Sequence, residues 1–272
     1  MGLRRFQIDS VKHPSPKSGG AGVSLRLAAP NKLAHWRNMT FSTKEPETLA
    51  WIDGLSPEGP LLDVGANVGL YSIYFAISHE QKVLSFEPSV FNLTTLTRNI
   101  HLNGLSDIVT VFPTALLNRD GPQPLALSST EEASALSSFG VAFGHDGEEF
   151  TPEMVYRLPG YRFDSLVAAG FVEEFPVAAK IDVDGIEHFV LEGMANSLAD
   201  PRMRSILIEV NTSFDTQYKR CHELLSGAGF KLVQETHSEL IKNGDFSSTF
   251  NQIWEKPRSS TREENRVSSV SD

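Results

Sequence analysis

A glycine turn between an expected strand and an expected helix constrains the fold of this chain more than any other feature. The turn reads Asp63-Val64-Gly65-Ala66-Asn67-Val68-Gly69 and follows the apolar pair Leu61-Leu62. Residues 70–76, directly after it, are apolar and aromatic, as in a buried helix. Because glycine lacks a Cβ, the backbone can turn sharply at Gly65 and Gly69, and a ligand can lie against it near the positive end of the helix. Strand, turn and helix together predict a nucleotide-binding α/β unit.

A carboxylate at the end of the next expected strand supports this prediction. Glu87 follows the apolar segment 82–86, where it can accept hydrogen bonds from both hydroxyls of a ribose. A dinucleotide fingerprint would have glycine where Asn67 stands, and a phosphate-binding loop would end in Gly-Lys-Ser or Gly-Lys-Thr. The turn therefore favours S-adenosylmethionine as the ligand, and an NAD-dependent oxidoreductase is the alternative.

Strands and helices alternate along the chain as a parallel sheet requires. The expected strands are residues 60–64, 83–86, 108–113, 178–183, 205–210, 230–235 and 250–255. The expected helices are residues 46–54, 70–77, 90–103 and 186–198, with another around 218–228. Ser42 and Glu45 have the spacing of a capping box for the helix 46–54. The last two strands follow each other directly, which predicts an antiparallel hairpin that closes the sheet.

Composition limits the kinds of partner that we expect. The chain has 272 residues, of which 40% are hydrophobic and 21% charged, and this is enough for one large α/β domain. A formal net charge of -10 argues against a broad phosphate-binding surface, so nucleic acid is not an expected partner. The single cysteine excludes an internal disulfide. The sequence has neither a membrane-spanning apolar run nor a secretory signal, so we expect a cytoplasmic protein.

Four blocks of sequence carry a family resemblance. They are Asp63 to Tyr71, then Phe86-Glu87-Pro88-Ser89 with Asn99 and Asn103-Gly104-Leu105, then Lys180-Ile181-Asp182-Val183-Asp184-Gly185-Ile186-Glu187, and finally Ile206 to Asn211. In order and spacing they resemble the FkbM family of S-adenosylmethionine-dependent methyltransferases, over about residues 40 to 256, although Asp184 stands where that family more often has Glu.

The resemblance implies both a fold and an activity. The fold is that of a class I methyltransferase: a Rossmann-like three-layer sandwich with a seven-stranded, mostly parallel sheet of order 3-2-1-4-5-7-6 and an antiparallel terminal hairpin. The activity is methyl transfer to a hydroxyl of a small molecule or glycan, such as a sugar, a glycolipid precursor or a natural product. A non-catalytic S-adenosylmethionine-binding module remains the alternative to an enzyme, and the oligomeric state is open.

Within this reading the chain divides into three parts. Residues 1–40 are the expected N-terminal arm, partly flexible, because Pro14, Pro16 and nearby glycines leave little to bury. Residues 41–256 are the expected methyltransferase domain, and 257–272 the expected disordered tail. Inside the domain, residues 128–162 are rich in serine and glycine and interrupt the alternation of strands and helices. We expect them to form a substrate-side loop or a short hairpin.

The resemblance also implies a cofactor site. Its residues are Asp63, Gly65, Asn67, Gly69, Glu87, Asp182 and, on the adenine side, Ala115 after the third strand. Part of this set is also expected to lie together for a reason that does not depend on the resemblance, because ligands of open α/β sheets bind at the carboxyl ends of the strands. That edge brings together Asp63, Glu87, Asp182 and Glu209.

Transfer to a hydroxyl requires a group that orients the hydroxyl and takes its proton. Asp182 is the main catalytic candidate, and Glu187 and His188 are close to it in sequence. Glu187 also fits a capping box with Asp184, in which the acids bind helix amides. His188 falls with Glu192 on the polar side of its helix, as a solvated surface histidine would.

A metal ion is a further alternative for the same acids. Asp182 together with Glu209 or Asn211 could hold magnesium, which prefers oxygen ligands. We do not assign a metal site from the sequence, and S-adenosylmethionine is the one cofactor that we expect.

Overall fold

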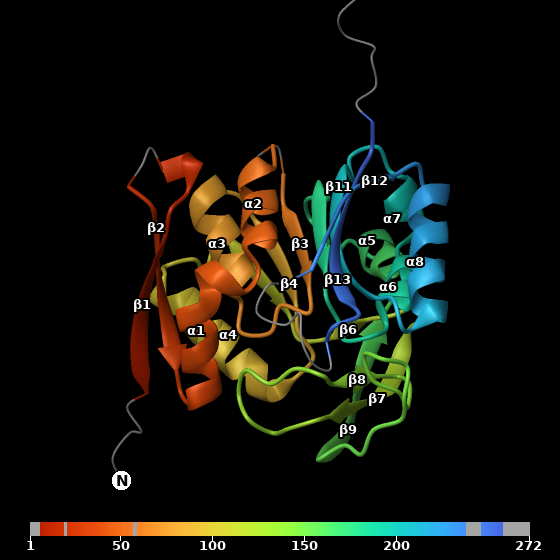
Figure 1. The fold of residues 1–272 in the computed structure, drawn as a ribbon, viewed down its shortest axis with the longest axis horizontal. Helices are drawn as coiled ribbons and strands as arrows, with labels where there is room; N and C mark the ends of the chain where they lie inside the picture. The colour runs from red at the N-terminus through yellow and green to blue at the C-terminus, as the bar shows by residue number, and fades with distance from the viewer. Residues whose placement is uncertain (1–5, 19–20, 57–58, 238–245, 258–272) are drawn as a thin grey trace, which may run out of the picture.

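The computed structural model describes residues 6–18, 21–56, 59–237 and 246–257 (Figure 1). The helices are α1 (Lys32–Lys44), α2 (Pro46–Gly54), α3 (Leu70–His79), α4 (Val90–Leu102), α5 (Phe163–Ala168), α6 (Glu187–Gly193), α7 (Ala195–Ala199) and α8 (Asp215–Gly227). The strands are β1 (Gln7–His13), β2 (Val23–Ala29), β3 (Leu61–Val64), β4 (Val83–Phe86), β5 (Val109–Phe112), β6 (Ala115–Leu116), β7 (Gly121–Leu127), β8 (Ser138–Phe139), β9 (Met154–Tyr161), β10 (Ala178–Ile181), β11 (Ser205–Asn211), β12 (Lys231–Thr236) and β13 (Thr249–Glu255). Within the described ranges, no helix has the length and apolar character needed to cross a membrane.

Seven strands form the central sheet, in the order β12-β13-β11-β10-β3-β4-β5. The five strands from β11 to β5 run parallel, whereas β13 is antiparallel to both β11 and β12. Numbered along the chain and read from the β5 edge, the order is 3-2-1-4-5-7-6. The expected class I methyltransferase sheet and its terminal hairpin are therefore confirmed.

Helices cover both faces of this sheet and complete the three layers (Figure 1). Helices α1 to α4 pack on one face in a core that includes Leu61 of β3. Helices α5 to α8 pack on the other face in a core that includes the neighbouring Leu62. Successive side chains of a strand point to opposite faces, so the continuous apolar runs of these strands serve two cores at once.

The N-terminal segment is not a loosely docked arm in its described part. Strands β1 and β2 pair as an antiparallel hairpin, and Leu25 and Leu27 are completely buried. The hairpin packs on α4, where Asn99 Oδ1 accepts a hydrogen bond of 2.7 Å from the Ala28 N–H. The alternation of apolar and polar residues from 23 to 27 is a strand signal that the flanking prolines and glycines concealed. The expected boundary after residue 40 falls inside α1.

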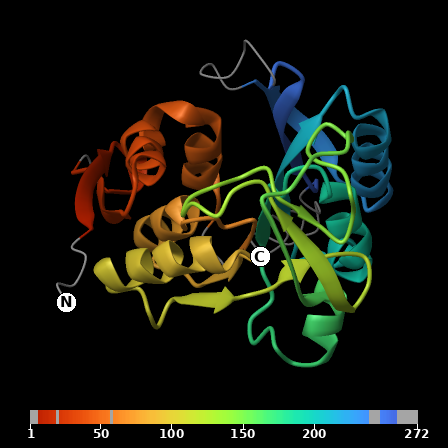
Figure 2. The same ribbon diagram turned by 90° about the horizontal axis from the view of Figure 1, so that it is seen from below.

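Residues 128–162 contain an irregular connection and a strand that pairs back on β7, and their place on the substrate side stays a prediction. The long strand β9 pairs with β7, so the segment returns to a four-stranded sheet of order β6-β9-β7-β8. Residues 128–153 connect these strands and contain the short β8. In Figure 2 this lime-green segment crosses the centre of the molecule, over the ends of the central strands. The predicted tail falls almost entirely outside the described residues, which end at 257.

Two details of the expected helices are wrong. Ser42 lies inside α1, and Glu45 precedes α2 without a side-chain capping bond. Residues 186–198 form α6 and α7 rather than one helix, and α6 ends at Gly193, where a Cβ would lie 1.9 Å from the Leu117 carbonyl oxygen. Asp164 accepts hydrogen bonds from the backbone N–H groups of Asn196 and Ser197 at the start of α7.

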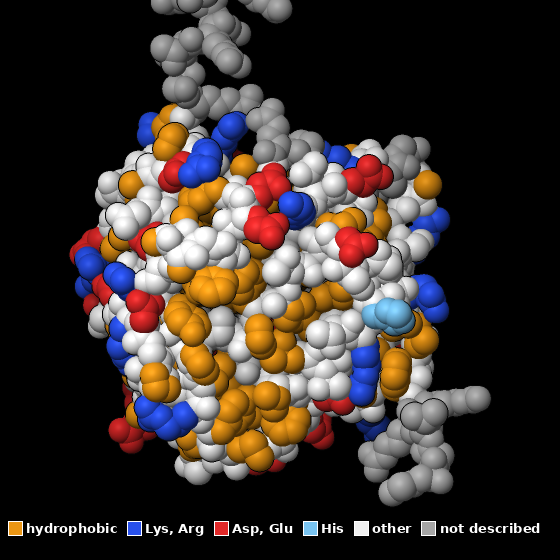
Figure 3. Space-filling view, turned by 180° about the vertical axis from the view of Figure 1, so that it is seen from behind, with side chains coloured by type: hydrophobic (Ala, Val, Ile, Leu, Met, Phe, Trp, Pro, Cys, Tyr) orange, Lys and Arg blue, Asp and Glu red, His pale blue; other side chains and the backbone are white. Residues whose placement is uncertain are grey.

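Figure 3 shows one face of the molecule. Hydrophobic side chains occupy much of its middle, and Lys, Arg, Asp and Glu side chains are scattered around them.

Candidate functional site

A cavity of about 400 Å³ opens at the carboxyl ends of β3, β4, β10 and β11. Its volume lies within the range of small-molecule sites. It is lined by five of the predicted residues: Gly65, Asn67, Glu87, Ala115 and Asp182. The other predicted residues, Asp63, Gly69, Glu187 and His188, lie outside its lining. The cavity thus gathers most of the predicted cofactor site and one of the three catalytic candidates.

The glycine turn forms the floor of this cavity. Gly65 has a φ of +81°, and a Cβ there would lie 1.8 Å from the Asp182 carbonyl oxygen. Gly69 has a φ of +83° and begins α3. Asn67 lies between them with a φ of 51°, which asparagine tolerates better than most residues. The turn therefore needs glycine both for its conformation and for its close contact with the strand that carries Asp182.

Glu87 lies at the tip of β4 with 5% of its surface exposed. Its carboxylate accepts hydrogen bonds of 2.8 Å from the backbone N–H groups of Asn67 and Ser89. Burial raises the pKa of Glu87 to about 7, although these two N–H groups oppose the shift. A carboxylate has about four acceptor positions, so the side chain can still receive hydroxyl groups of a ligand in the cavity.

Asp63 occupies a different place from the one that we expected. It is 1% exposed, and its Oδ2 accepts a hydrogen bond of 2.5 Å from Ser72 of α3. Burial raises the pKa of Asp63 against the opposing charge of Lys180. Because Asp63 lies below the cavity lining, its visible contribution is to connect β3 with α3.

Residues 131–137, which we call the cover segment, close one side of the cavity. The Asn67 amide donates a hydrogen bond of 2.7 Å to Ser134 O, and the Asn92 amide donates another of 3.1 Å to the same oxygen. Asn92 also accepts a bond of 2.9 Å from Ala133 N, and Arg37 Nε donates one of 2.7 Å to Ala133 O. Sequence reasoning missed this role of Asn92 and Arg37, because the contacts join segments far apart in the chain.

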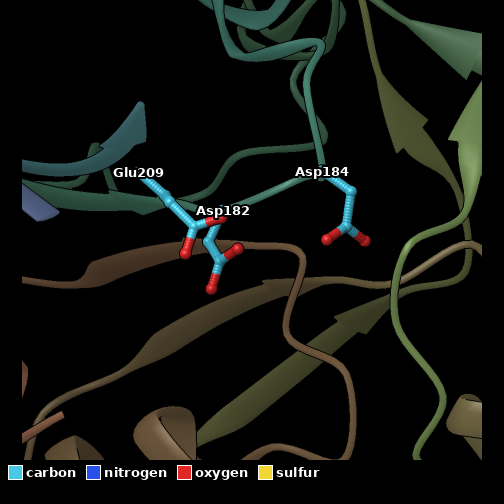
Figure 4. Close-up of side chains that lie close together, drawn as sticks. All are labelled: Asp182, Asp184 and Glu209. Atoms are coloured by element: carbon cyan, nitrogen blue, oxygen red, sulfur yellow. The ribbon is translucent and has the colours of Figure 1, made fainter. Parts of the chain in front are cut away.

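Three carboxylates that line the cavity lie near one another (Figure 4). One oxygen from each of Asp182, Asp184 and Glu209 lies within 4.8 Å of the other two, and in the described part of the chain only these three acids are close enough to share a metal ion. Asn211 is not part of this group, because its amide donates to His145 O. Oxygen ligands of this kind suit a divalent cation.

Burial and mutual repulsion perturb two of these acids. Burial raises the pKa of Asp184 to about 6, and the charge of Asp182 adds to this, while backbone N–H groups oppose it. Leu136 of the cover segment donates one such bond, of 2.7 Å, to Asp184 Oδ2. For Glu209, burial and the Asp182 charge hold the pKa well above its usual range. The shift favours the neutral form of Glu209 beside Asp182.

Lys180 is the main functional candidate that we did not identify from the sequence. Its Nζ donates a hydrogen bond of 2.7 Å to Asp182 Oδ2 and lies 5.1 Å from the centre of the Tyr71 ring. Burial alone would lower the pKa of Lys180, but the charges of Asp182, Asp63 and Glu45 outweigh it and raise the pKa. A lysine within the otherwise apolar segment 178–181 is the sequence feature that could have indicated a functional role for Lys180.

Glu45 extends this network to the other wall of the cavity. It accepts hydrogen bonds of 2.5 Å from Lys44 Nζ and 2.8 Å from the Tyr71 hydroxyl. Burial would raise the pKa of Glu45, but the cations Lys44 and Lys180 lower it to about 2. Glu45 therefore stays ionised as a counter-charge behind Lys180.

Glu187 does not reach the cavity. It is 1% exposed and accepts hydrogen bonds from the backbone N–H groups of Val183 and Gly185 and from the Gln217 amide. Burial raises the pKa of Glu187 to about 7. The predicted capping box is present only on the Glu187 side, because the Asp184 carboxylate turns to the cover segment instead.

His188 is not the solvated surface residue suggested by its position on the helix. It is 4% exposed and lies against the rings of Phe189 and Phe214. Burial lowers the pKa of His188. Phe214, from the turn before α8, covers the side of α6 that the helical pattern marked as polar, and His188 stays outside the cavity lining.

Comparisons with known proteins agree with this geometry. The model of the Methyltransferase FkbM domain matches residues 63–232. The chain is 26% identical over 235 residues to a hexuronic acid methyltransferase, AglP, of Haloferax volcanii, covering 83% of this chain and 84% of that protein. It is 29% identical over 205 residues to the 31-O-demethyl-FK506 methyltransferase FkbM of Streptomyces tacrolimicus, covering 66% and 76%.

Among solved structures, a methyltransferase FkbM of Methylobacillus flagellatus matches with a TM-score of 0.49 and 13% identity, over 73% of this chain and 44% of that one. The sequence match carries the assignment, because the family model spans more than half of the chain and contains the turn, Glu87 and Asp182. The chain belongs to the FkbM family and is an S-adenosylmethionine-dependent methyltransferase.

Proposed function

We propose that this enzyme transfers a methyl group to a hydroxyl oxygen of a sugar, a glycolipid precursor or a natural product. The observation that carries the proposal is the place of Asp182: its carboxylate lines the cavity next to the glycine turn and is held by a buried lysine. The names of two relatives support the acceptor class, since one acts on a hexuronic acid and the other on an O-demethyl natural product.

The residues around the turn fit S-adenosylmethionine. Glu87 would receive the ribose hydroxyls, and Ala115 would contact the adenine side. Asn67 contributes a buried amide oxygen that has no hydrogen-bond partner among the described residues, although Asn67 lines the cavity. A buried acceptor without a partner is costly, so a ligand that donates a hydrogen bond there would be favoured. When bound, S-adenosylmethionine supplies an electrophilic methyl group.

The residues of the protein must orient the acceptor hydroxyl and take its proton. Asp182 would accept a hydrogen bond from the acceptor hydroxyl and hold its oxygen in line with the methyl group, a geometry that supplies much of the rate of such a displacement. As the oxygen gains the methyl group, its proton passes to Asp182.

A magnesium ion bound by the same acids is a second candidate arrangement. The three clustered carboxylates would hold the ion and could orient an acceptor oxygen. S-adenosylmethionine-dependent turnover measured with and without a chelator separates the two arrangements, because Asp182 acting alone needs no added cation. The oxidoreductase alternative has no support from the family match.

Turnover with purified protein tests the proposal. We expect S-adenosylmethionine and a panel of hydroxylated acceptors, including neutral sugars, uronic acids and macrolides, to give products heavier by one methylene unit. We expect Asp182→Asn to lower kcat by about 10² to 10⁴-fold while S-adenosylmethionine binding, measured by calorimetry, stays within a few fold.

The matched control is Asp215→Asn on the exposed surface of α8, which should retain full turnover. Unchanged kcat in Asp182→Asn would remove Asp182 from catalysis. Cofactor binding without methylation of any hydroxylated acceptor would support the non-catalytic module instead.

A further inference from the structure

Lys180 places a positive charge where a parallel sheet normally holds only apolar side chains. Every residue of β10 is buried, and the Lys180 side chain is 2% exposed. A charge in this position is costly unless it is closely paired. An aliphatic residue at this position would pack about as well in the strand, so packing alone does not explain why a lysine is found there.

The contacts of Lys180 converge on the proposed catalytic acid. Its Nζ donates to Asp182 Oδ2 at 2.7 Å and lies over the Tyr71 ring, 5.1 Å from the ring centre. Glu45 holds the Tyr71 hydroxyl at 2.8 Å and so fixes the orientation of the ring. The ammonium is therefore confined from several directions, and it acts on one oxygen of Asp182.

The other oxygen of Asp182 is left for a ligand. Among the described residues, no side chain other than Lys180 hydrogen-bonds to the Asp182 carboxylate, and 28% of the Asp182 side chain is exposed in the cavity. A carboxylate on a short side chain can otherwise rotate about its terminal bond. Fixing Oδ2 determines where Oδ1 lies.

We infer that Lys180 is a positioning residue for methyl transfer: it holds Oδ2 of Asp182 so that Oδ1 faces the acceptor hydroxyl. The inference rests on the proposed function, because it requires Asp182 to receive the hydroxyl proton. Lys180 lines the cavity but its side chain is only 2% exposed, and in the inferred role it acts through Asp182. A displacement of about 1 Å at a reacting group can cost about 10²-fold in rate, so we expect the effect to fall on kcat.

A double-mutant cycle separates this role from a structural one. The four proteins are the wild type, Lys180→Met, Asp182→Asn and the double variant, each assayed for kcat, KM of both substrates, S-adenosylmethionine affinity and thermal unfolding. We expect Lys180→Met to lower kcat about 10²-fold with S-adenosylmethionine affinity within a few fold. In the Asp182→Asn background, the same substitution should change kcat by less than about threefold, because the group through which Lys180 acts is already lost.

Lys180→Gln provides a partial rescue, because its amide can still donate to Asp182. We expect its kcat to exceed that of Lys180→Met, and it replaces the methionine variant in the cycle if that variant does not fold. Lys82→Met is the matched control, because Lys82 forms an exposed ion pair with Glu174 at the other end of the sheet. This substitution should leave kcat unchanged.

The two proposals fail in different ways. If Asp182→Asn keeps full turnover, the proposed catalytic role of Asp182 is wrong. If Asp182→Asn is impaired but the Lys180 substitution lowers kcat by the same factor in both backgrounds, Lys180 is structural and the inference is overturned. Unchanged kcat in Lys180→Met overturns it as well.

Discussion

Glu87 shows at the scale of a single residue how burial prepares a cofactor contact. Its carboxylate is nearly inaccessible in the described structure and is held by two backbone N–H groups. Burial brings its pKa to about 7, so its charge changes close to neutral pH. Ribose hydroxyls would donate to the ionised form, which means that binding favours loss of the proton.

The affinity for S-adenosylmethionine should depend on pH, because Glu87 changes its charge near neutral pH. S-adenosylmethionine should bind the wild type less tightly as the pH falls through about 7, because below the pKa a proton must first leave Glu87. Glu87→Gln should weaken binding about 10 to 100-fold at pH 8, as expected for lost charge-assisted hydrogen bonds, and should show no such pH dependence. Calorimetry at several pH values measures both effects.

Glu187→Gln is the control, because Glu187 also titrates near pH 7 but lies outside the cavity. It should keep the pH dependence of the wild type. If Glu87→Gln retained that dependence, another group in the cavity would be responsible.

Individual site residues were predictable where the chemistry follows from local sequence. The glycine turn, Glu87 and Asp182 all stand at strand ends, and strand ends can be located from apolar runs. Asn92 and Glu45 could not be assigned, because their partners Ser134 and Tyr71 belong to other segments of the chain. Lys180 was overlooked although Asp182 lies only two residues further on, because local sequence does not show that its side chain is buried against that acid. His188 was misplaced for the same reason: Phe214, which covers it, belongs to a later element.

At the scale of elements, the cover segment is the part of the site with the least regular structure. It has no helix or strand of its own, and side chains from α1, α4, the glycine turn and the loop after β10 hold its backbone. Ala133 and Leu136 adopt positive φ values of 72° and 61°. Such conformations persist only when the surrounding contacts fix them.

Loss of one of these contacts should loosen the cover segment selectively. Asn92→Ala removes the hydrogen bonds to Ala133 N and Ser134 O. We expect faster amide hydrogen exchange in residues 131–137, faster dissociation of S-adenosylmethionine and a roughly tenfold loss of affinity, since each buried hydrogen bond contributes about 1 kcal/mol. Exchange mass spectrometry and stopped-flow displacement measure these quantities.

Asn196→Ala, at an exposed position of α7, is the matched control and should change neither quantity. Faster amide hydrogen exchange throughout α4 in Asn92→Ala would indicate general unfolding of that helix. An unchanged cofactor off-rate in Asn92→Ala would show that the cover segment does not retain the ligand.

At the scale of the whole molecule, the sheet was the most predictable feature. Parallel strands buried on both faces produce apolar runs that alternate with amphipathic helices, and the right-handed crossover rule leaves few possible orders. The N-terminal hairpin was less predictable, because Pro14, Pro16 and the neighbouring glycines surround a short alternating strand. The four-stranded second sheet depends on pairing β7 with β9 across residues 128–153, a distance over which local patterns carry no information.

The buried acids also determine how the stability of the whole protein varies with pH. Glu87 and Glu187 have a pKa of about 7 in the folded protein because both are buried, whereas glutamate in an unfolded chain titrates near pH 4.3. The folded state therefore binds more protons between these values, and its stability falls as the pH rises through about 7. His13, His79, His188 and His222, whose pKa burial lowers, act in the opposite direction as the pH falls towards and below about 6.5, where histidine in the unfolded chain takes up a proton.

Between about pH 8 and pH 6.5 each of the two glutamates should therefore raise the free energy of unfolding of the ligand-free protein by roughly 1 kcal/mol. The histidines oppose this rise and the buried carboxyls of Asp184 and Glu209 add to it, so the contribution of one glutamate is measured as the difference between a variant and the wild type. Urea denaturation across this range measures the change. Relative to the wild type, Glu187→Gln should lack roughly 1 kcal/mol of the stability gained between pH 8 and pH 6.5, whereas Glu223→Gln, at an exposed ion pair on α8, should keep the pH dependence of the wild type. A Glu187→Gln variant with the same pH dependence as the wild type would mean that Glu187 is already ionised in the folded protein over this range.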